Sequence, residues 1–387
     1  VVVVVVVVVV MMTMSGLGAQ AQLVVERVLR GTVTLGNSAQ TAQTAFGEFP
    51  DNYQLASVER AFVRTSLAAP AGVDPQDGQV AAELTATGVR VRRNSGRSVV
   101  VTVAYEVVVF ADVADAPHVQ HGVVQGTGGT CCRINVDIDN EPQYQSLKRE
   151  SSFVIFSMML SGSTYGENDY YAASFETDTR IAFYKGPSTA VTPSTTIYFQ
   201  VVSLGSLHAS VQHVDTGGFV QNQRVTLATA AFAPARTWLL ASHNLDRTAS
   251  AEVEVQSACV DSYLDGSDAV TFERYQGGSR SVVETFWPNA QLVEFTAASG
   301  VTVEQHTFAF ASGAAKIAWT LPTPVVDATL VLASLNSMYA GGRADVANDD
   351  APAPALVRLE PFAQSPTTVD ATRADVGSAA HVSATLV

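Results

Sequence analysis

An apolar five-residue segment recurs three times along this chain of 387 residues, at a nearly constant interval. Its copies are Glu106–Phe110, Gln200–Leu204 and Gln291–Phe295. The ends of successive copies are 94 and 91 residues apart. Self-similarity at a fixed interval is the sequence signature of repeat architectures. The chain is therefore expected to be an array of similar modules, an organisation typical of structural and adhesive proteins.

Two further landmarks keep the same interval. The first is a large apolar residue followed by Val or Leu, two variable residues and Ser, in Phe62–Ser66, Phe153–Ser157, Trp238–Ser242 and Leu330–Ser334. The second is an alternating run that ends on a cation, in Val89–Arg93, Ile181–Lys185 and Val270–Arg274. The fourth copy of this run, Leu356–Glu360, is interpreted as having lost its cation, and His381–Val387 as a degenerate signature. Terminal repeats are expected to be atypical, so the pattern predicts four tandem modules.

Each landmark has the residue pattern of a β-strand. Val99–Phe110 is rich in β-branched and aromatic residues that alternate with a period of two. Turn-forming residues such as Gly186-Pro187-Ser188 separate the landmarks. A unit of about 90 residues built from short strands has the size of a two-sheet β-sandwich. We therefore predict an all-β fold of four tandem β-sandwich modules, each with its own small core.

The predicted boundaries follow the landmarks. They are an N-terminal arm at 1–23 and modules at 24–112, 113–206, 207–297 and 298–387. Val1–Val10 is an unbroken poly-valine run, interpreted as a placeholder for unassigned residues and excluded from the argument. On that interpretation the chain begins near Met11 without a secretory signal.

Composition narrows the expected partners. Hydrophobic residues make up 47% of the chain, yet no apolar run reaches the 18 or more residues of a membrane helix, so no membrane insertion is expected. The net charge is −14, and basic residues form no large cluster, which argues against nucleic-acid binding. Cys131, Cys132 and Cys259 do not form a disulfide framework, so we expect synthesis in a reducing cytoplasm.

The spacing of the candidate catalytic and metal-binding residues does not fit a functional site. Gln120-His121, Gln212-His213 and Gln305-His306 recur at 92 and 93 residues, which predicts equivalent structural positions in three different modules. The repeated Ser lacks the flanking glycines of a nucleophile elbow. Asp137–Asn140 and the acidic stretch at 261–268 are oxygen-rich but do not match a calcium loop. We therefore expect no enzyme, no catalytic residue, no metal site and no cofactor.

One loop of the second module stands apart. Its sequence at 161–171 combines Tyr165, Tyr170 and Tyr171 with Ser, Gly and Asn. Tyrosine offers a large contact area at low entropic cost and stacks on sugars or peptides. These three tyrosines are the candidate ligand-binding residues, with packing on the same module or on a neighbouring subunit as the alternative.

The modules resemble β-rich repeats of tailed-bacteriophage virion proteins, namely tail fibres, tail-tip proteins and head fibres. The residues that carry the resemblance are Trp287–Phe295 with Arg274, and Tyr105–Phe110 with Arg93. The chain departs from that pattern by inserting Pro288-Asn289-Ala290 and by lacking the signature in the fourth module. The six-stranded sandwiches of the H-type lectins are similar in size and strand count only.

The resemblance implies a structural virion component made in the host cytoplasm, namely a tail fibre or tail-tip protein that presents β modules to the host surface. It also implies assembly with itself, as a homotrimer, and attachment to other virion proteins through the N-terminal arm. Two alternatives stay open. One is a capsid-decorating or head-fibre protein, and the other is a carbohydrate-binding adhesin that contacts host-surface glycan through the Tyr165 loop.

Overall fold

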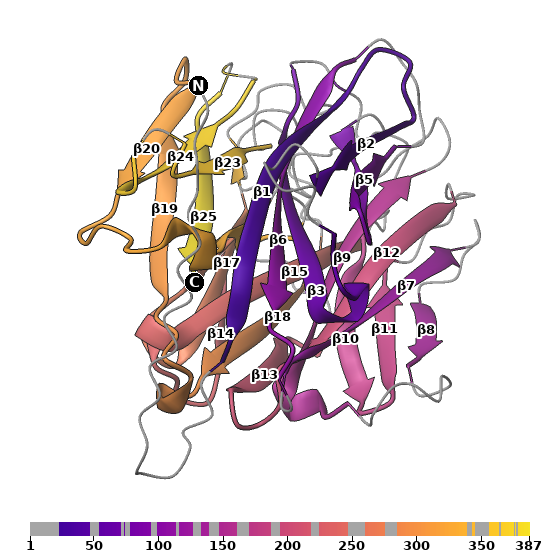
Figure 1. Ribbon diagram of the computed structural model, residues 1–387, viewed down its shortest axis with the longest axis vertical. Helices are drawn as coiled ribbons and strands as arrows, with labels where there is room; N and C mark the ends of the chain where they lie inside the picture. The colour runs from indigo at the N-terminus through magenta and orange to yellow at the C-terminus, as the bar shows by residue number, and fades with distance from the viewer. Residues whose placement is uncertain are drawn as a thin grey trace.

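The structure of the chain is a computed structural model, shown in Figure 1. It describes residues 23–46, 54–70, 73, 78–93, 99–113, 116–126, 133–138, 147–160, 170–186, 194–217, 224–246, 260–274, 285–338, 343–344, 356–363, 365–374, 376 and 378–387. Over these residues the fold is almost entirely β, with 25 strands and no helix of seven or more residues. The all-β prediction is confirmed.

The first twelve strands form four small antiparallel sheets. Strand set 1 consists of β1 (Val25–Leu35), β2 (Thr41–Ala45), β3 (Ala61–Ala68), β4 (Ala81–Thr85), β5 (Gly88–Arg92) and β6 (Val101–Phe110). Strand set 2 consists of β7 (His118–Gly126), β8 (Arg133–Asp137), β9 (Ser152–Leu160), β10 (Ala172–Thr177), β11 (Arg180–Tyr184) and β12 (Thr195–Ser203). The sheet orders are β1-β6-β3 and β2-β5-β4 in set 1, and β7-β12-β9 and β8-β11-β10 in set 2.

The remaining strands repeat this order. Strand set 3 consists of β13 (Ala209–Asp215), β14 (Arg224–Ala228), β15 (Thr237–Asp246), β16 (Val260–Leu264), β17 (Ala269–Arg274) and β18 (Thr285–Phe295). Strand set 4 consists of β19 (Glu304–Phe310), β20 (Lys316–Thr320), β21 (Ala333–Leu335), β22 (Arg343–Ala344), β23 (Arg358–Pro361), β24 (Thr368–Thr372) and β25 (Ala380–Leu386). In every set the central strand of one sheet is the last strand, flanked by the first and third; we call this the 1-6-3 sheet. The division into separately folded modules stays a prediction.

A short 3-10 turn precedes the third strand of each set. These turns are η2 (Val58–Arg60), η3 (Arg149–Ser151), η5 (Pro234–Arg236) and η8 (Ala328–Leu330). The first strand of the next set packs on each of them: β7 on η2, β13 on η3 and β19 on η5. The same relation links the two ends of the chain, because β1 packs on η8. Figure 1 shows the yellow strands of set 4 beside the indigo strands of set 1.

The register corrects two predictions about the fourth copy. Ala333 pairs with Leu386 as Val63 pairs with Val107, so the segment equivalent to Phe62–Ser66 is Leu332–Asn336 and not Leu330–Ser334. The cation is also retained. Because β22 is an additional strand of set 4, β24 corresponds to the fifth strand of the other sets, and Arg373 follows it directly. Leu356–Glu360, the segment that the sequence pattern predicts for this run, overlaps β23 instead, which corresponds to the fourth strand of the other sets.

The cation that follows this strand makes the same hydrogen bonds in sets 1 and 4. Arg93 donates through Nε to the Ala39 carbonyl at 2.9 Å and through Nη2 to the Gly36 carbonyl at 2.8 Å. Arg373 donates in the same way to the Ala314 and Ala311 carbonyls, at 2.8 and 2.9 Å. Both side chains are almost fully buried. A buried guanidinium that satisfies turn carbonyls holds the loop against the strand that follows.

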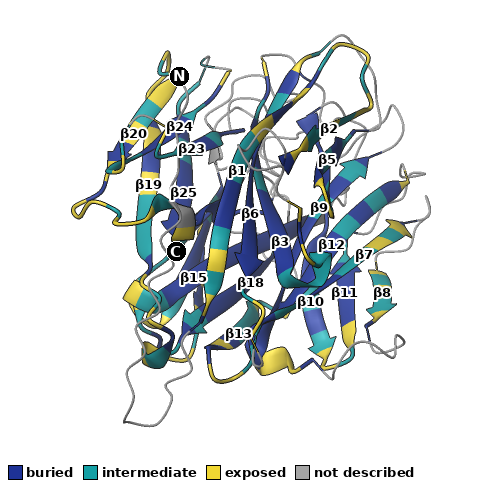
Figure 2. Cartoon of the chain, viewed as in Figure 1, coloured by how far each residue is buried: buried dark blue, intermediate teal, exposed yellow. Residues whose placement is uncertain are grey.

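The buried apolar residues form two contiguous clusters rather than the four separate cores that the sequence predicts. One consists mainly of residues of sets 2 and 3 and also takes in Phe62 of set 1 and Leu332 of set 4, and the other joins sets 1 and 4. Figure 2 shows that the strands meeting near the centre, such as β6, β15 and β18, are largely buried, whereas exposed residues gather at the periphery. The cores merge because the sets pack large apolar side chains against one another.

Four equivalent side chains, one from each set, come together in a single cluster. Phe62, Phe153, Trp238 and Leu332 occupy equivalent positions on the segments leading into or forming the third strands, and all four are buried in one cluster. The ring centroid of Phe62 is 6.3 Å from that of Phe153 and 6.1 Å from that of Trp238. Phe153 and Trp238 meet edge to face at 5.4 Å, a favoured geometry for aromatic pairs. The contact between Phe62 and Trp238 joins sets 1 and 3, which are not neighbours in the sequence.

Two glycines in the first strands make room for aromatic rings on the partner strand. Gly122 pairs with Phe199, and a Cβ at Gly122 would lie 2.1 Å from Cζ of that ring. Gly31 pairs with Tyr105, and a Cβ there would lie 2.3 Å from the Tyr105 hydroxyl oxygen. The ring covers the glycine, which compensates for the missing side chain in the strand.

Replacing Gly122 with Ala should therefore destabilise the fold by about 1 to 3 kcal/mol, because the Phe199 ring must move out of a packed position. The free energy of unfolding is measured by urea denaturation. Gly36→Ala is the matched control, since a Cβ at Gly36 meets nothing within 4 Å. Equal stabilities for the two variants would contradict the packing argument.

Candidate functional site at the contacts between strand sets

The polar residues that the sequence repeats come together in one row across each 1-6-3 sheet. Each row consists of three directly opposed residues, from the first, last and third strand in that order. The contact rows are Arg30–Glu106–Arg64 in set 1, His121–Gln200–Ile155 in set 2, His213–Gln291–Leu240 in set 3 and Gln305–Thr385–Ser334 in set 4. In each row the polar residue of the last strand is buried and stands between apolar residues, so its side chain needs a specific hydrogen-bond partner.

In sets 2 and 3 that partner is the backbone of the preceding set. The Gln200 side chain accepts from the Val63 amide at 2.7 Å and donates to the Val63 carbonyl at 3.0 Å. Gln291 brackets Val154 in the same way, at 2.7 and 2.8 Å. A carboxamide presents a donor and an acceptor as a peptide group does, so each glutamine extends the pairing of a third strand by one rung. All four bonds are buried, where an unmade bond is costly.

In sets 2 and 3 the histidine of the row binds the turn in front of that third strand. His121 Nε2 lies 2.9 Å from the Val58 carbonyl oxygen and 3.0 Å from that of Ala61. His213 Nε2 lies 3.0 Å from the Arg149 carbonyl oxygen. Because carbonyl oxygens only accept, this network assigns the proton to Nε2 in both rings. The histidines are therefore structural donors.

Burial lowers the pKa of both histidines, against the opposing effect of the carbonyls that they contact. The pKa of His213 falls to about 4, and its Nδ1 is buried without a hydrogen-bond partner. A second proton would have to be placed on that nitrogen. The folded protein therefore favours the neutral imidazole, and protonation at low pH destabilises this contact.

The fourth row corrects the histidine repeat read from the sequence. Gln305, and not His306, lies opposite the last strand at the place of His121 and His213. Its side chain donates to the Thr237 carbonyl at 3.0 Å and accepts from the Thr385 hydroxyl at 2.8 Å. His306 points to the other face and stacks on the Trp319 ring at 4.8 Å, with an interplanar angle of 8°. An amide thus replaces the imidazole as the donor to the turn.

The serines that end the landmark segments make a second series of contacts. Ser157 Oγ accepts from the Ala82 amide at 2.9 Å, and Ser242 Oγ accepts from the Ala173 amide at 3.2 Å. Ser66 Oγ accepts from the Leu359 amide at 3.0 Å, which again links set 1 to set 4. Asn336 holds this position in set 4 and donates to the Ser262 carbonyl at 2.8 Å. The side chain at this position therefore binds the preceding set, on its fourth strand in sets 1 to 3 and on the corresponding strand β23 in set 4.

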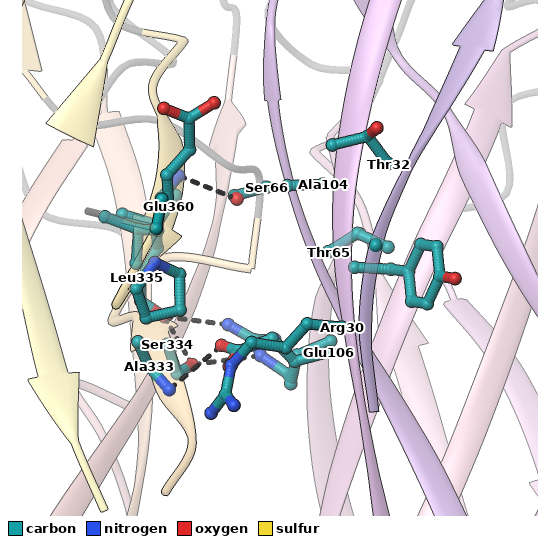
Figure 3. A pocket seen from close by; sticks show the side chains of 16 residues that line it. Arg30, Thr32, Thr65, Ser66, Ala104, Glu106, Ala333, Ser334, Leu335 and Glu360 are labelled. Carbon is teal, nitrogen blue, oxygen red and sulfur yellow. Dashed lines mark hydrogen bonds and ion pairs between the residues drawn. The ribbon is translucent and has the colours of Figure 1, made fainter. Parts of the chain in front are cut away.

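The contact of set 1 with set 4 is the ionic version of the same arrangement. Arg30 donates through Nε to Glu106 at 2.6 Å, through Nη1 to the Ala328 carbonyl at 2.6 Å, and through Nη2 to the Val331 carbonyl. The other oxygen of Glu106 accepts from the Ala333 amide at 2.9 Å. Figure 3 shows these side chains reaching from the strands of set 1 towards those of set 4.

Arg64 completes this row from the third strand. It donates to Ser334 Oγ at 3.0 Å, to the Leu335 carbonyl at 2.7 Å and to Met338 Sδ at 3.3 Å. A cavity of about 230 Å³ lies between the two sets here and is lined by both arginines, Glu106 and Ser334. The polar atoms of the row are directed to protein groups that flank the cavity, so their arrangement fits a structural contact.

Burial sets the ionisation of the charged row. It raises the pKa of Glu106, against the opposing effects of Arg30, the Ala333 amide and Arg64. It also lowers the pKa of Arg64 to about 10, against the attraction of Glu106. The two arginines and the carboxylate offset part of one another's desolvation, and removing one of them leaves the others uncompensated.

Taken in order, the contacts form a closed circuit. Set 2 binds set 1, set 3 binds set 2, set 4 binds set 3 and set 1 binds set 4. Asp261 reinforces the third of these, because its carboxylate accepts from the Ser383 amide at 2.9 Å and from its hydroxyl at 3.1 Å. The circuit includes His121, His213 and Asp261, which belong to the segments that the sequence marks as candidates for metal-binding or acid–base chemistry.

The tyrosine loop is only partly within the described residues. Tyr170 and Tyr171 are 3% and 2% exposed and belong to the core, and the Tyr170 hydroxyl lies 3.3 Å from Gln79 Nε2. Neither side chain has the exposure that glycan stacking requires, which corrects their assignment as ligand-binding residues. Tyr165 lies outside the described residues, and its proposed role stays a prediction.

Two features of the described residues bear on other functions. No group of three or more His, Cys, Asp or Glu side chains in that part of the chain is arranged to hold a metal ion. Within the same residues, no helix has the length and apolar character needed to cross a membrane. Asp137, singled out in the sequence, pairs with Arg180 at 2.7 Å.

Comparison of the chain with protein-family models, curated proteins and solved structures gave no match. The candidate site is therefore interpreted from its own geometry. That geometry holds strand sets together, and the repeated polar residues contribute by binding backbone groups.

Replacing Gln200 with Leu should destabilise the fold by about 2 kcal/mol or more, because the amide and carbonyl of Val63 both lose a buried partner. Chemical denaturation gives the free energy, and hydrogen exchange of the Val63 amide reports the contact directly. Gln125→Leu is the matched control on an exposed position of the neighbouring strand. An unchanged Val63 exchange rate would refute the bracketing role.

His213→Gln should make stability less dependent on pH. The lowered pKa means that the stabilisation from neutral His213 is fully present above pH 6.5 and is lost as pH falls towards about 4. Glutamine keeps the donor, as Gln305 does naturally, and does not titrate. Unfolding free energies at pH 7.5 and 4.5 should differ less in the variant than in the wild type. Identical differences would disprove the coupling.

Proposed function

We propose that the chain is a structural protein built as four β-sandwich modules closed into a ring, and that it serves in a tailed-bacteriophage virion. The observation that carries the structural role is the closed circuit of contact rows. Each row binds backbone groups of the preceding set, so the chain acts as a single-chain counterpart of a cyclic tetramer. The phage assignment rests on the residue patterns of Trp287–Phe295 and Tyr105–Phe110.

Ring closure favours a rigid, load-bearing body over a string of flexible modules. A chain of modules joined only by linkers bends at each junction, whereas a closed ring restrains every junction by the other three. Rigidity suits a tail-fibre or tail-tip part that presents a surface to the host. Assembly into a homotrimer, and attachment to other virion proteins through the arm at 1–23, would use surfaces other than the contact rows.

The test is to locate the protein on virus particles by electron microscopy with Fab fragments raised against the purified folded chain. The proposal predicts label at the distal tail, and Fab pre-absorbed with the purified chain is the control. Label over the head would favour a capsid-decorating or head-fibre protein. Label on no particle would reject the virion role and leave a carbohydrate-binding adhesin, which a glycan array with Tyr165→Ala would examine.

A further inference from the structure

The four contact rows differ most at the place that closes the ring. The residue contributed by the third strand is Arg64 in set 1, Ile155 in set 2, Leu240 in set 3 and Ser334 in set 4. The same residue belongs both to the row of its own set and to the surface that the next set faces. It is therefore suited to distinguish one neighbour from another.

Arg64 fits set 4 because Ser334 is small and polar. The Ser334 hydroxyl accepts from Arg64 Nε, and the short side chain leaves room for the guanidinium to reach the Leu335 carbonyl. The cavity of about 230 Å³ at this contact is part of that room. Arg64 is only 5% exposed, so its bonds to set 4 must offset the desolvation of a charge.

The equivalent surfaces of the other sets would not accept Arg64. Set 2 and set 3 present Ile155 and Leu240 at the place of Ser334, and these branched side chains offer no acceptor and occupy the space. Set 1 of a second copy presents Arg64 itself, so that two buried guanidinium groups would face each other. Unpaired and like charges are the usual means by which an interface rejects wrong partners.

We propose that Arg64 and Ser334 form a specificity pair for ring closure, so that the charged row of set 1 accepts set 4 and rejects sets 1 to 3, on the same chain or on a second copy. This inference rests on the proposed ring of four modules. Arg30 and Glu106 supply the affinity, because they repeat the donor and acceptor positions of the other rows. The Arg64–Ser334 pair supplies the discrimination.

A double-mutant cycle read by hydrogen exchange tests the pair. The reporters are the amides of Ala333 and Leu359, which donate to Glu106 and Ser66 across the closing contact. The internal controls are the amides of Val63 and Val154, which donate across the other contacts. The full chain is used throughout.

Ser334→Leu, which installs the residue of set 3, should raise exchange at both reporters on the order of tenfold and leave both controls unchanged. Adding Arg64→Ile should restore most of the protection, because an apolar pair then replaces the arginine and serine. If the fold-changes in exchange rate caused by the two single substitutions simply multiply in the double mutant, the proposed pairing is wrong. If Ser334→Leu exposes all four amides, the chain has unfolded, and the cycle is decided with Ser334→Ala, which removes the acceptor and keeps the space.

Failure of the ring is distinguishable from failure of the pair. In the wild type, reporters that exchange like an unstructured peptide beside protected controls would show that sets 1 and 4 do not meet, which rejects the proposed ring. Protected wild-type reporters with independent substitution effects would keep the ring and reject the pair.

Discussion

Three of the four strand sets depend on one recurring constraint, which is a polar side chain in the middle of an apolar strand that must be satisfied by the backbone of another set. Glu106, Gln200 and Gln291 all lie in buried positions of central strands. Without a partner, each side chain would lower the free energy of unfolding, because burial removes the water that hydrogen-bonds to it. When it binds the main chain of the preceding set, each side chain fixes the register of the contact, because its hydrogen bonds form only when a particular amide lies opposite.

This constraint explains why the contacts between sets are directional. The first and last strands of a 1-6-3 sheet, with the repeated serine of its third strand, bind the preceding set. The next set binds the backbone of that third strand and the turn before it. Donor and acceptor surfaces are therefore different, which makes the interface head-to-tail. Head-to-tail interfaces either close or propagate. Here the row of set 1 meets set 4, and the cluster of Phe62, Phe153, Trp238 and Leu332 fills the centre.

The rows also show how one geometry tolerates different chemistry. Imidazole, guanidinium and carboxamide all donate to the carbonyls around the turns, and the partner on the last strand is a carboxamide, a carboxylate or a hydroxyl. The two histidine contacts weaken in acid, because a neutral ring is what the site binds. The charged contact pays a desolvation cost that the neutral ones avoid, and in return it differs in shape and charge from the other three.

The all-β class and the spacing of the repeated strands were determined by the sequence, because alternation and turn residues act locally. The importance of Glu106, Gln200, Gln291 and the histidines was also visible there, as polar residues at fixed places in apolar repeats. Their partners were not, since Val63 and Val154 contribute only backbone atoms and carry no sequence signal. The same limit misplaced the fourth copy, where Gln305 substitutes for a histidine and Arg373 lies beyond the expected interval. Tyr170 and Tyr171 looked like loop residues by composition, and only packing placed them in the core. Local pattern specifies strands, whereas the meeting of distant strands depends on shape and on backbone groups that every sequence shares.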